Sequence, residues 1–100
     1  MSEVQLNVDN MYNGSIEAII NGISSNRPFE LINAIIAGTK LDFRSEKFIE
    51  GLKRAEQNEE TLLGVPIKEF AIASLDVIGV RKYIGDNDRI KEMIRCKFNF

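Results

Sequence analysis

The stretch of sequence that decides the fold is Pro66-Ile67-Lys68-Glu69-Phe70-Ala71-Ile72-Ala73-Ser74-Leu75-Asp76-Val77-Ile78-Gly79. Pro66 can occupy the first turn of a helix, where its missing N–H costs nothing, and Gly79 can close the same helix as a C-terminal cap. Between these two residues, apolar and small side chains recur at helical spacing on one face. They are Ile67, Phe70, Ala71, Ser74, Leu75 and Ile78. The stretch predicts a buried helix over residues 66–79.

The segment before this helix predicts its antiparallel partner. Ser45 has the chemistry of an N-cap, and a narrow apolar stripe follows it between charged residues. The stripe consists of Phe48, Ile49, Leu52 and Ala55. We expect an amphipathic, half-exposed helix that ends in the polar run 57–60. With the helix at 66–79 it should form a helical hairpin over residues 45–79.

An earlier hairpin is predicted over residues 15–38. Isoleucines recur at helical spacing before the polar break 24–26, at Ile16, Ile19, Ile20 and Ile23. Pro28 then opens a nearly all-apolar helix that we expect to close at Gly38. Because so short a break separates the two helices, they should fold back on one another.

The two ends of the chain complete the predicted fold. Residues 1–13 alternate apolar and polar side chains without a second strand to pair with, which predicts an arm or an irregular first helix. Asp86 can cap a terminal helix over residues 86–97. Seven glycines and two prolines leave little room for an all-β fold. We therefore expect one all-α domain over residues 1–100, with about five helices.

The chain also matches itself at an offset of 41 residues. A fixed period of this kind is typical of stacked helical repeats. The offset superposes Phe29, Leu31, Asn33, Ile36 and Gly38 on Phe70, Ile72, Ser74, Val77 and Gly79. It also carries Ile49 onto Ile90 and Leu52 onto Met93.

This period, with one amphipathic helix followed by a more apolar one, resembles HEAT-type repeats. The residues that carry the resemblance are Phe48-Ile49-Glu50-Gly51-Leu52 for the outer helix and the stretch 66–79 for the inner one. Lys68, Ala71, Leu75 and Gly79 fit the order of basic residue, Ala, Leu and closing Gly that is common in the inner helix. The resemblance implies a short right-handed stack of antiparallel helical hairpins, a HEAT-like α-solenoid.

Residues 48–94 also resemble small bacterial HEAT-like proteins, among them immunity proteins that neutralise polymorphic toxins. That resemblance implies a protein-binding module, and we expect an immunity protein that blocks a toxin by steric complex formation. Two alternatives stay open. One is an inhibitor of a host nuclease from a phage or mobile element, and the other is a scaffold domain that assembles with itself, for example as a homodimer.

Composition bears on the remaining classes of function. The chain has no histidine, which removes the commonest general base, nucleophile partner and nitrogen ligand. We expect no enzyme, no cofactor and no metal. The net charge of −2 makes nucleic acid an unlikely partner, and no apolar run reaches the ~20 residues that cross a bilayer. The single Cys96 and the absence of a secretory start predict a cytoplasmic protein.

Charged and aromatic residues of the second half are the candidates for partner binding. They are Glu50, Lys53, Arg54, Glu56, Asp76, Arg81 and Tyr83. Asp76 interrupts an apolar helix, so its carboxylate must reach solvent or be paired. It either pairs with a basic residue such as Arg81 or points from the concave face towards a partner.

Overall fold

The computed structural model describes residues 3–99 and confirms a mostly helical chain. Within this range there are six helices and one small β-hairpin. The helices are α1 (Glu3–Tyr12), α2 (Ile16–Ile23), α3 (Pro28–Lys40), α4 (Glu46–Ala55), α5 (Ile67–Val77) and α6 (Asp88–Cys96). The hairpin strands are β1 (Thr61–Leu62) and β2 (Val65–Pro66), which pair antiparallel between α4 and α5.

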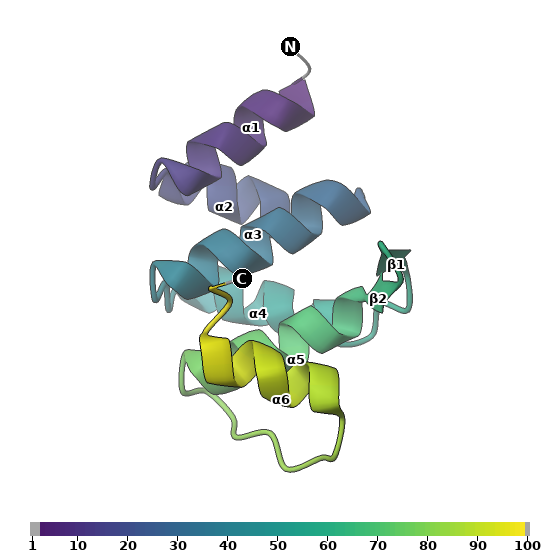
Figure 1. The fold of residues 1–100 in the computed structure, drawn as a ribbon. Helices are drawn as coiled ribbons and strands as arrows, with labels where there is room; N and C mark the ends of the chain where they lie inside the picture. Colours follow the sequence, from purple (N-terminus) through teal and green to yellow (C-terminus); the bar gives the residue numbers. More distant parts are fainter. Residues whose placement is uncertain (1–2, 100) are drawn as a thin grey trace.

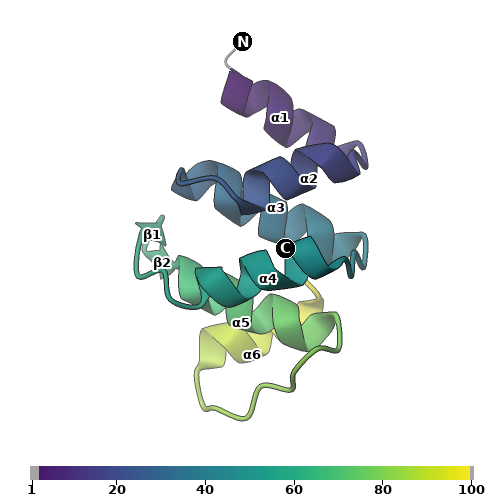
Figure 2. The same cartoon turned by 180° about the vertical axis from the view of Figure 1, so that it is seen from behind.

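The helices form two layers along the 39 Å long axis of the molecule (Figures 1 and 2). In one layer α1, α3, α5 and α6 run in the same direction, and in the other α2 and α4 run in the opposite direction. Within the layers α1 packs on α3, α3 on α5, α5 on α6 and α2 on α4. Across the layers α2 packs on α3 and α4 on α5. Helices that are close in the chain are therefore also close in space.

The core runs through all six helices. Its fully buried side chains include Met11, Ile19, Ile35, Phe48, Leu52, Ile67, Leu75 and Phe98. One polar pair lies within it, because the Thr39 and Ser74 hydroxyl oxygens are 2.6 Å apart across the α3–α5 contact. Thr39 donates its only hydroxyl proton to the Ile35 carbonyl, so Ser74 is the donor in this pair. Both buried hydroxyl groups are thereby satisfied.

The segment expected as an arm or irregular first helix forms the regular helix α1 from Glu3. Residues 1 and 2 lie outside the described range. Val8 and Met11 are buried, while Leu6, which shares the apparent alternation, is 54% exposed. The apolar–polar alternation of this segment therefore indicated the two-residue period of a strand, whereas the buried positions follow helical spacing. This helix brings the count to six instead of five.

Gly38 does not close α3, which continues to Lys40. A Cβ at position 38 would lie 2.4 Å from the buried Phe48 ring, so this glycine allows a close approach of α3 and α4. Gly79, its counterpart at the 41-residue offset, follows α5 with a φ of +82°. The aligned phenylalanines differ as well, since Phe29 is 43% exposed and Phe70 only 9%. These aligned positions have different structural roles.

Two of the four predicted helix starts, at Ser45 and Pro28, are confirmed as predicted. Ser45 caps α4 by accepting a hydrogen bond from the Phe48 N–H at 3.2 Å, and Pro28 opens α3. The predicted cap Asp86 is wrong, because Asn87 caps α6. Its side-chain oxygen accepts from the N–H groups of Arg89 and Ile90 at 3.0 and 3.3 Å. The neutral amide and the carboxylate are both good caps, and the register of the loop selects between them.

The connection from α4 to α5 contains a β-hairpin that was not predicted, because only the polar run 57–60 was considered between the two helices. Its two central residues, Leu63 and Gly64, both have positive φ, at +54° and +81°. Such a turn matches the twist of the flanking strands and normally carries Asn-Gly. Pro66 ends β2, so α5 begins one residue later at Ile67.

Candidate protein-binding surface

Residues 78–87, which join α5 to α6, form a long and largely exposed loop at the end of the α2–α4 layer, anchored by the buried Ile78 (Figure 2). The loop is long because α5 and α6 run in the same direction and the chain must return along α5. Within residues 3–99 no further helix continues the α2–α4 layer at this place. The loop lies there instead.

Asp76 holds this loop against α5. Its Oδ2 accepts a hydrogen bond from the Tyr83 backbone N–H at 2.7 Å, and the Tyr83 hydroxyl accepts from the Asn87 N–H at 2.9 Å. The predicted pairing of Asp76 with Arg81 is wrong. Arg81 forms an ion pair with Glu56 at the end of α4, and this carboxylate raises the pKa of the guanidinium.

Glu69 fixes the far end of the loop. This buried carboxylate accepts through Oε1 from the Asn87 amide at 3.0 Å and from the Arg89 guanidinium at 3.2 Å. Arg89 also donates to the Gly64 carbonyl at 3.2 Å, which ties the hairpin turn to the same cluster. Oε2 is buried and has no hydrogen-bond partner within residues 3–99. Glu69 lies in the first turn of α5, where the helix dipole stabilises negative charge.

The two loops joined by this cluster carry the two most exposed large apolar side chains of residues 3–99. Leu63 in the hairpin turn is 96% exposed, and Ile84 in the α5–α6 loop is 92% exposed. A single exposed apolar residue is ordinary. Leu63, however, also sits at positive φ, a conformation that costs free energy for a side chain of its kind. We call these two residues and the loops that bear them the Leu63–Ile84 surface.

Ile84 borders a hollow of about 210 Å³ between the end of α4, α5 and the loop. The hollow is lined by Glu56, Ile72, Arg81, Lys82, Tyr83, Ile84 and Gly85. The Tyr83 ring lies against Gly85, where a Cβ would come within 2.3 Å of the hydroxyl oxygen. Sites for small molecules usually enclose roughly 300–1,000 Å³. This hollow is of a size for a side chain of a partner.

The structure brings part of the predicted binding set together. Glu56, Arg81 and Tyr83 line the hollow, and Asp76 lies beneath the loop. Lys53 is exposed about one turn before Glu56 on α4. Glu50 is exposed elsewhere on α4, and Arg54 lines a separate hollow beside Ser24 and Asn26, at the end of α2. These last two residues do not join the Leu63–Ile84 surface.

Four residues of this surface were missed by the sequence analysis: Leu63, Glu69, Ile84 and Asn87. Gly64 between Thr61-Leu62 and Val65 favours a turn, so the turn that exposes Leu63 had a weak signal in the sequence. Glu69 lies within the predicted buried helix, but its burial depends on α6. No periodic pattern includes Ile84, because the loop that bears it has no regular structure.

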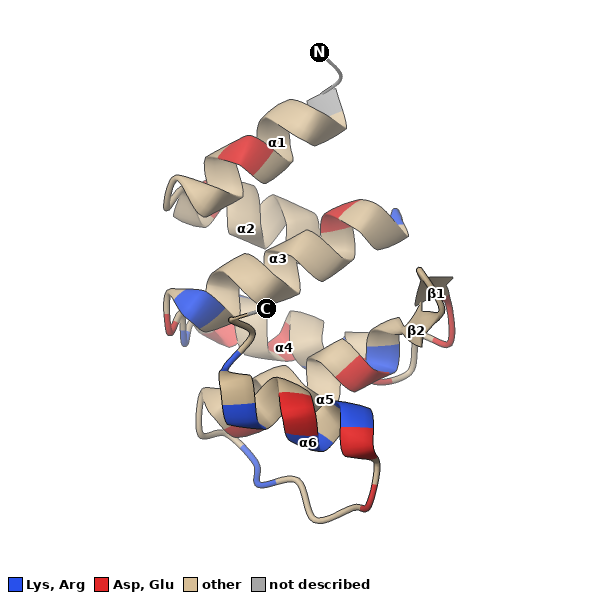
Figure 3. Cartoon of the chain, in the orientation of Figure 1, with Lys and Arg blue, Asp and Glu red and all other residues tan. Residues whose placement is uncertain are grey.

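Charged side chains are sparse over α1 to α3 and dense over α4 to α6 (Figure 3). Most bases near the loop have a carboxylate partner: Arg81 has Glu56, Arg89 has Glu69, and Lys91 has Asp86 at 3.6 Å. Lys82, on the lining of the hollow, has no such partner within residues 3–99. The lining therefore carries an excess of one positive charge.

No family model, no curated protein and no solved structure matches this chain. Within residues 3–99, none of the helices has both the length and the apolar character needed to span a bilayer. The geometry of the Leu63–Ile84 surface is thus the basis for an assignment of function.

Proposed function

We propose that the chain is a protein-binding module that engages its partner through the Leu63–Ile84 surface. The observation that carries the proposal is that the two most exposed large apolar side chains of residues 3–99 stand on loops that are linked by the buried carboxylate of Glu69 and by Arg89. Loops that are fixed before binding lose little conformational entropy when a partner docks. A few apolar anchors within a polar rim commonly supply most of the affinity of an interface.

In this proposal the partner is a bacterial toxin, which the chain neutralises by steric complex formation. The support is the resemblance of residues 48–94 to HEAT-like immunity proteins. The opposed directions of the two helix layers agree with a HEAT-like stack of hairpins. The stack acts as a rigid support, and the β1–β2 turn and the α5–α6 loop make the contacts. A single cysteine suits a protein that works in the reducing cytoplasm.

The test begins with the genomic neighbourhood, where the proposal expects a toxin gene directly upstream. That toxin is then co-expressed with the chain, and the affinity between the purified proteins is measured directly. We expect Ile84→Asp and Leu63→Asp each to weaken binding by at least about 30-fold, as loss of an interface anchor does. Growth protection should fall with the affinity.

The matched control is Leu41→Asp, which changes another exposed apolar residue, at the end of α3. This variant should bind the toxin like the wild type. The proposed surface is wrong if all three variants keep wild-type affinity. The proposed function is wrong if the wild-type chain neither binds the toxin nor protects the cells.

A further inference from the structure

The α2–α4 layer is continued below α4 by the loop 78–87 instead of a third helix (Figure 2). α2 packs against α3 and α4 packs against α5, so each helix of this layer covers a helix of the other. The loop covers α5 less completely, since a hollow lined by Ile72 on α5, by Glu56 and by loop residues 81–85 remains beside it.

We infer that an amphipathic helix of the partner docks over this hollow, with an apolar side chain in the hollow and a carboxylate near Lys82. The inference rests on the proposed function and names the chemistry of the partner segment. Ile72, Tyr83 and Ile84 form the apolar wall that the side chain meets. Helix-in-groove binding of this kind uses one apolar helix face.

A helix fits this place better than an added strand. The strands within residues 3–99 are only two residues long, which is too short an edge to hold another strand by main-chain hydrogen bonds. The existing layer also shows how an apolar helix face packs here, because α4 buries Phe48, Leu52 and Ala55 in the same layer.

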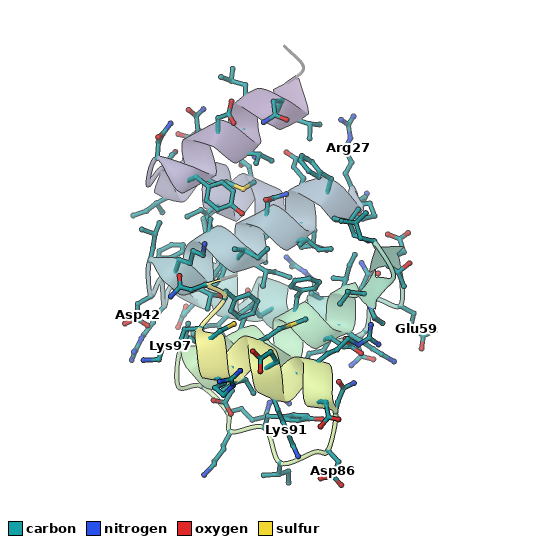
Figure 4. All side chains as sticks on the ribbon, viewed as in Figure 1. Arg27, Asp42, Glu59, Asp86, Lys91 and Lys97 are labelled. Carbon is teal, nitrogen blue, oxygen red and sulfur yellow. The ribbon has the colours of Figure 1, made fainter. Side chains whose placement is uncertain are left out.

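The charges around the hollow select an acidic helix. Glu56 compensates Arg81, and Asp86 compensates Lys91 at the foot of the molecule (Figure 4). The Asp76 carboxylate is turned to the Tyr83 N–H beneath the loop. Lys82 is the charge on the lining that these contacts leave uncompensated. A carboxylate of the partner would be attracted to it, whereas a partner lysine would meet a like charge.

Two synthetic helical peptides test the inference. Both carry the same leucine stripe at positions i, i+4 and i+7, and the flanking positions hold Glu in one peptide and Lys in the other. Each is titrated into the ¹⁵N-labelled full chain and followed by NMR. We expect the acidic peptide to shift the amide resonances of Ile72 and residues 81–85 and to bind at least about tenfold more tightly than the basic one.

Three variants sharpen the test. Lys82→Glu should reverse the preference between the peptides, Ile84→Asp should weaken both, and Leu41→Asp should change neither. The inference is overturned if both peptides bind equally, if neither binds, or if the shifts map to another face. It is also overturned if the same resonances shift on simple concentration of the chain, since a second copy would then be the occupant.

The outcomes separate this inference from the proposed function. If the acidic peptide binds but no toxin does, the proposed function fails and the chemistry of the hollow stands. If the toxin binds and Lys82→Glu does not change its affinity, the inference fails and the proposed function stands.

Discussion

Leu63 combines an unfavourable backbone conformation with a fully exposed apolar side chain. Asn adopts positive φ more readily than Leu, so Leu63→Asn should stabilise the chain by about 1 kcal/mol. The same change should weaken binding of the proposed toxin partner, because an apolar side chain of the proposed surface is lost. Urea denaturation followed by circular dichroism gives the first quantity and titration calorimetry the second. A variant that is less stable than the wild type would contradict this account of Leu63.

Gly38 is a second residue whose role depends on a single contact. Alanine favours helix more than glycine does, yet Gly38→Ala places a methyl group against the buried Phe48 ring. We expect a loss of about 1–3 kcal/mol, the usual cost of overpacking. Asn21→Ala on the exposed side of α2 is the control and should be neutral or slightly stabilising. Equal unfolding midpoints for the two variants would show that Phe48 can move aside.

Among the elements, α1 is held to α3 by a hydrogen bond from the Tyr12 hydroxyl to the Asn33 side-chain oxygen at 2.7 Å. Tyr12→Phe should cost about 1 kcal/mol and speed amide exchange in α1. The measurement is hydrogen exchange by NMR. In the wild type we expect the amides of α2 and α3 to exchange more slowly than those of α1. If Tyr12→Phe leaves the exchange rates of α1 unchanged, the role given to this hydrogen bond is wrong.

Tyr12 should also make the stability of the folded chain depend on pH in the alkaline range. Burial raises the pKa of Tyr12, which means that the folded state binds the phenol proton more tightly than the unfolded state does. This contribution to stability is complete below about pH 10 and is lost as the pH rises through the raised pKa. Urea midpoints from pH 9 to 12 should therefore fall more in the wild type than in Tyr12→Phe. A parallel fall in both chains would contradict the prediction.

The α5–α6 loop depends on the buried carboxylate of Glu69. Glu69→Gln removes the charge that binds Arg89, and we expect a loss of roughly 1–2 kcal/mol with faster exchange of the Tyr83 and Asn87 amides. Glu92→Gln is the matched control, because Glu92 pairs with Arg95 on the exposed side of α6. Such exposed pairs contribute little to stability. If both changes lower the stability and speed the amide exchange to a similar degree, Glu69 does not fix the loop as proposed.

The sequence predicted the elements that have a strong apolar period and clear caps. The helix expected to open at Pro28 and to close at Gly38, and the helix expected over residues 66–79, have bounds within three residues of those of α3 and α5, since Pro28 marks the beginning of one and Gly79 follows the end of the other. It failed where a segment supports two readings, as in α1, or where the decisive contact is distant in sequence. Gly38 illustrates the second case, because only the approach of Phe48 explains a glycine inside a helix.

For the whole molecule, the C-terminal tail is predicted to contribute strongly to stability. Phe98 is fully buried and its ring centre lies 6.3 Å from that of Phe70. Phe98→Ala should cost about 3–5 kcal/mol, a large part of the stability of a small domain. Leu6→Ala, on the exposed side of α1, should cost less than about 1 kcal/mol. Urea denaturation of both variants tests the contrast, and a small effect at Phe98 would contradict it.

The proposed binding surface was less predictable than the fold, for reasons that belong to the whole molecule. Charge and aromatic character made Glu56, Arg81 and Tyr83 candidates for partner binding, and the structure places all three on one hollow. Ile84 and Leu63 were missed because exposure is a property of the assembled chain. Asp76 was predicted to pair with Arg81, but its carboxylate accepts a hydrogen bond from the Tyr83 backbone N–H. The identities of the side chains do not reveal a backbone partner.

The contact pattern of the helices has a consequence for how the chain folds. α1, α2 and α3 contact one another, so this unit can begin to form before the rest of the chain has left the ribosome. Short sequence separations between contacting helices also favour rapid folding. The hydroxyl pair of Thr39 and Ser74 can form only once α5 packs on α3, so it joins the second half of the chain to the first. The contacts of Glu69 with Asn87 and Arg89 need residues near the C-terminus, so they cannot fix the loops that bear Leu63 and Ile84 before α6 has been synthesised.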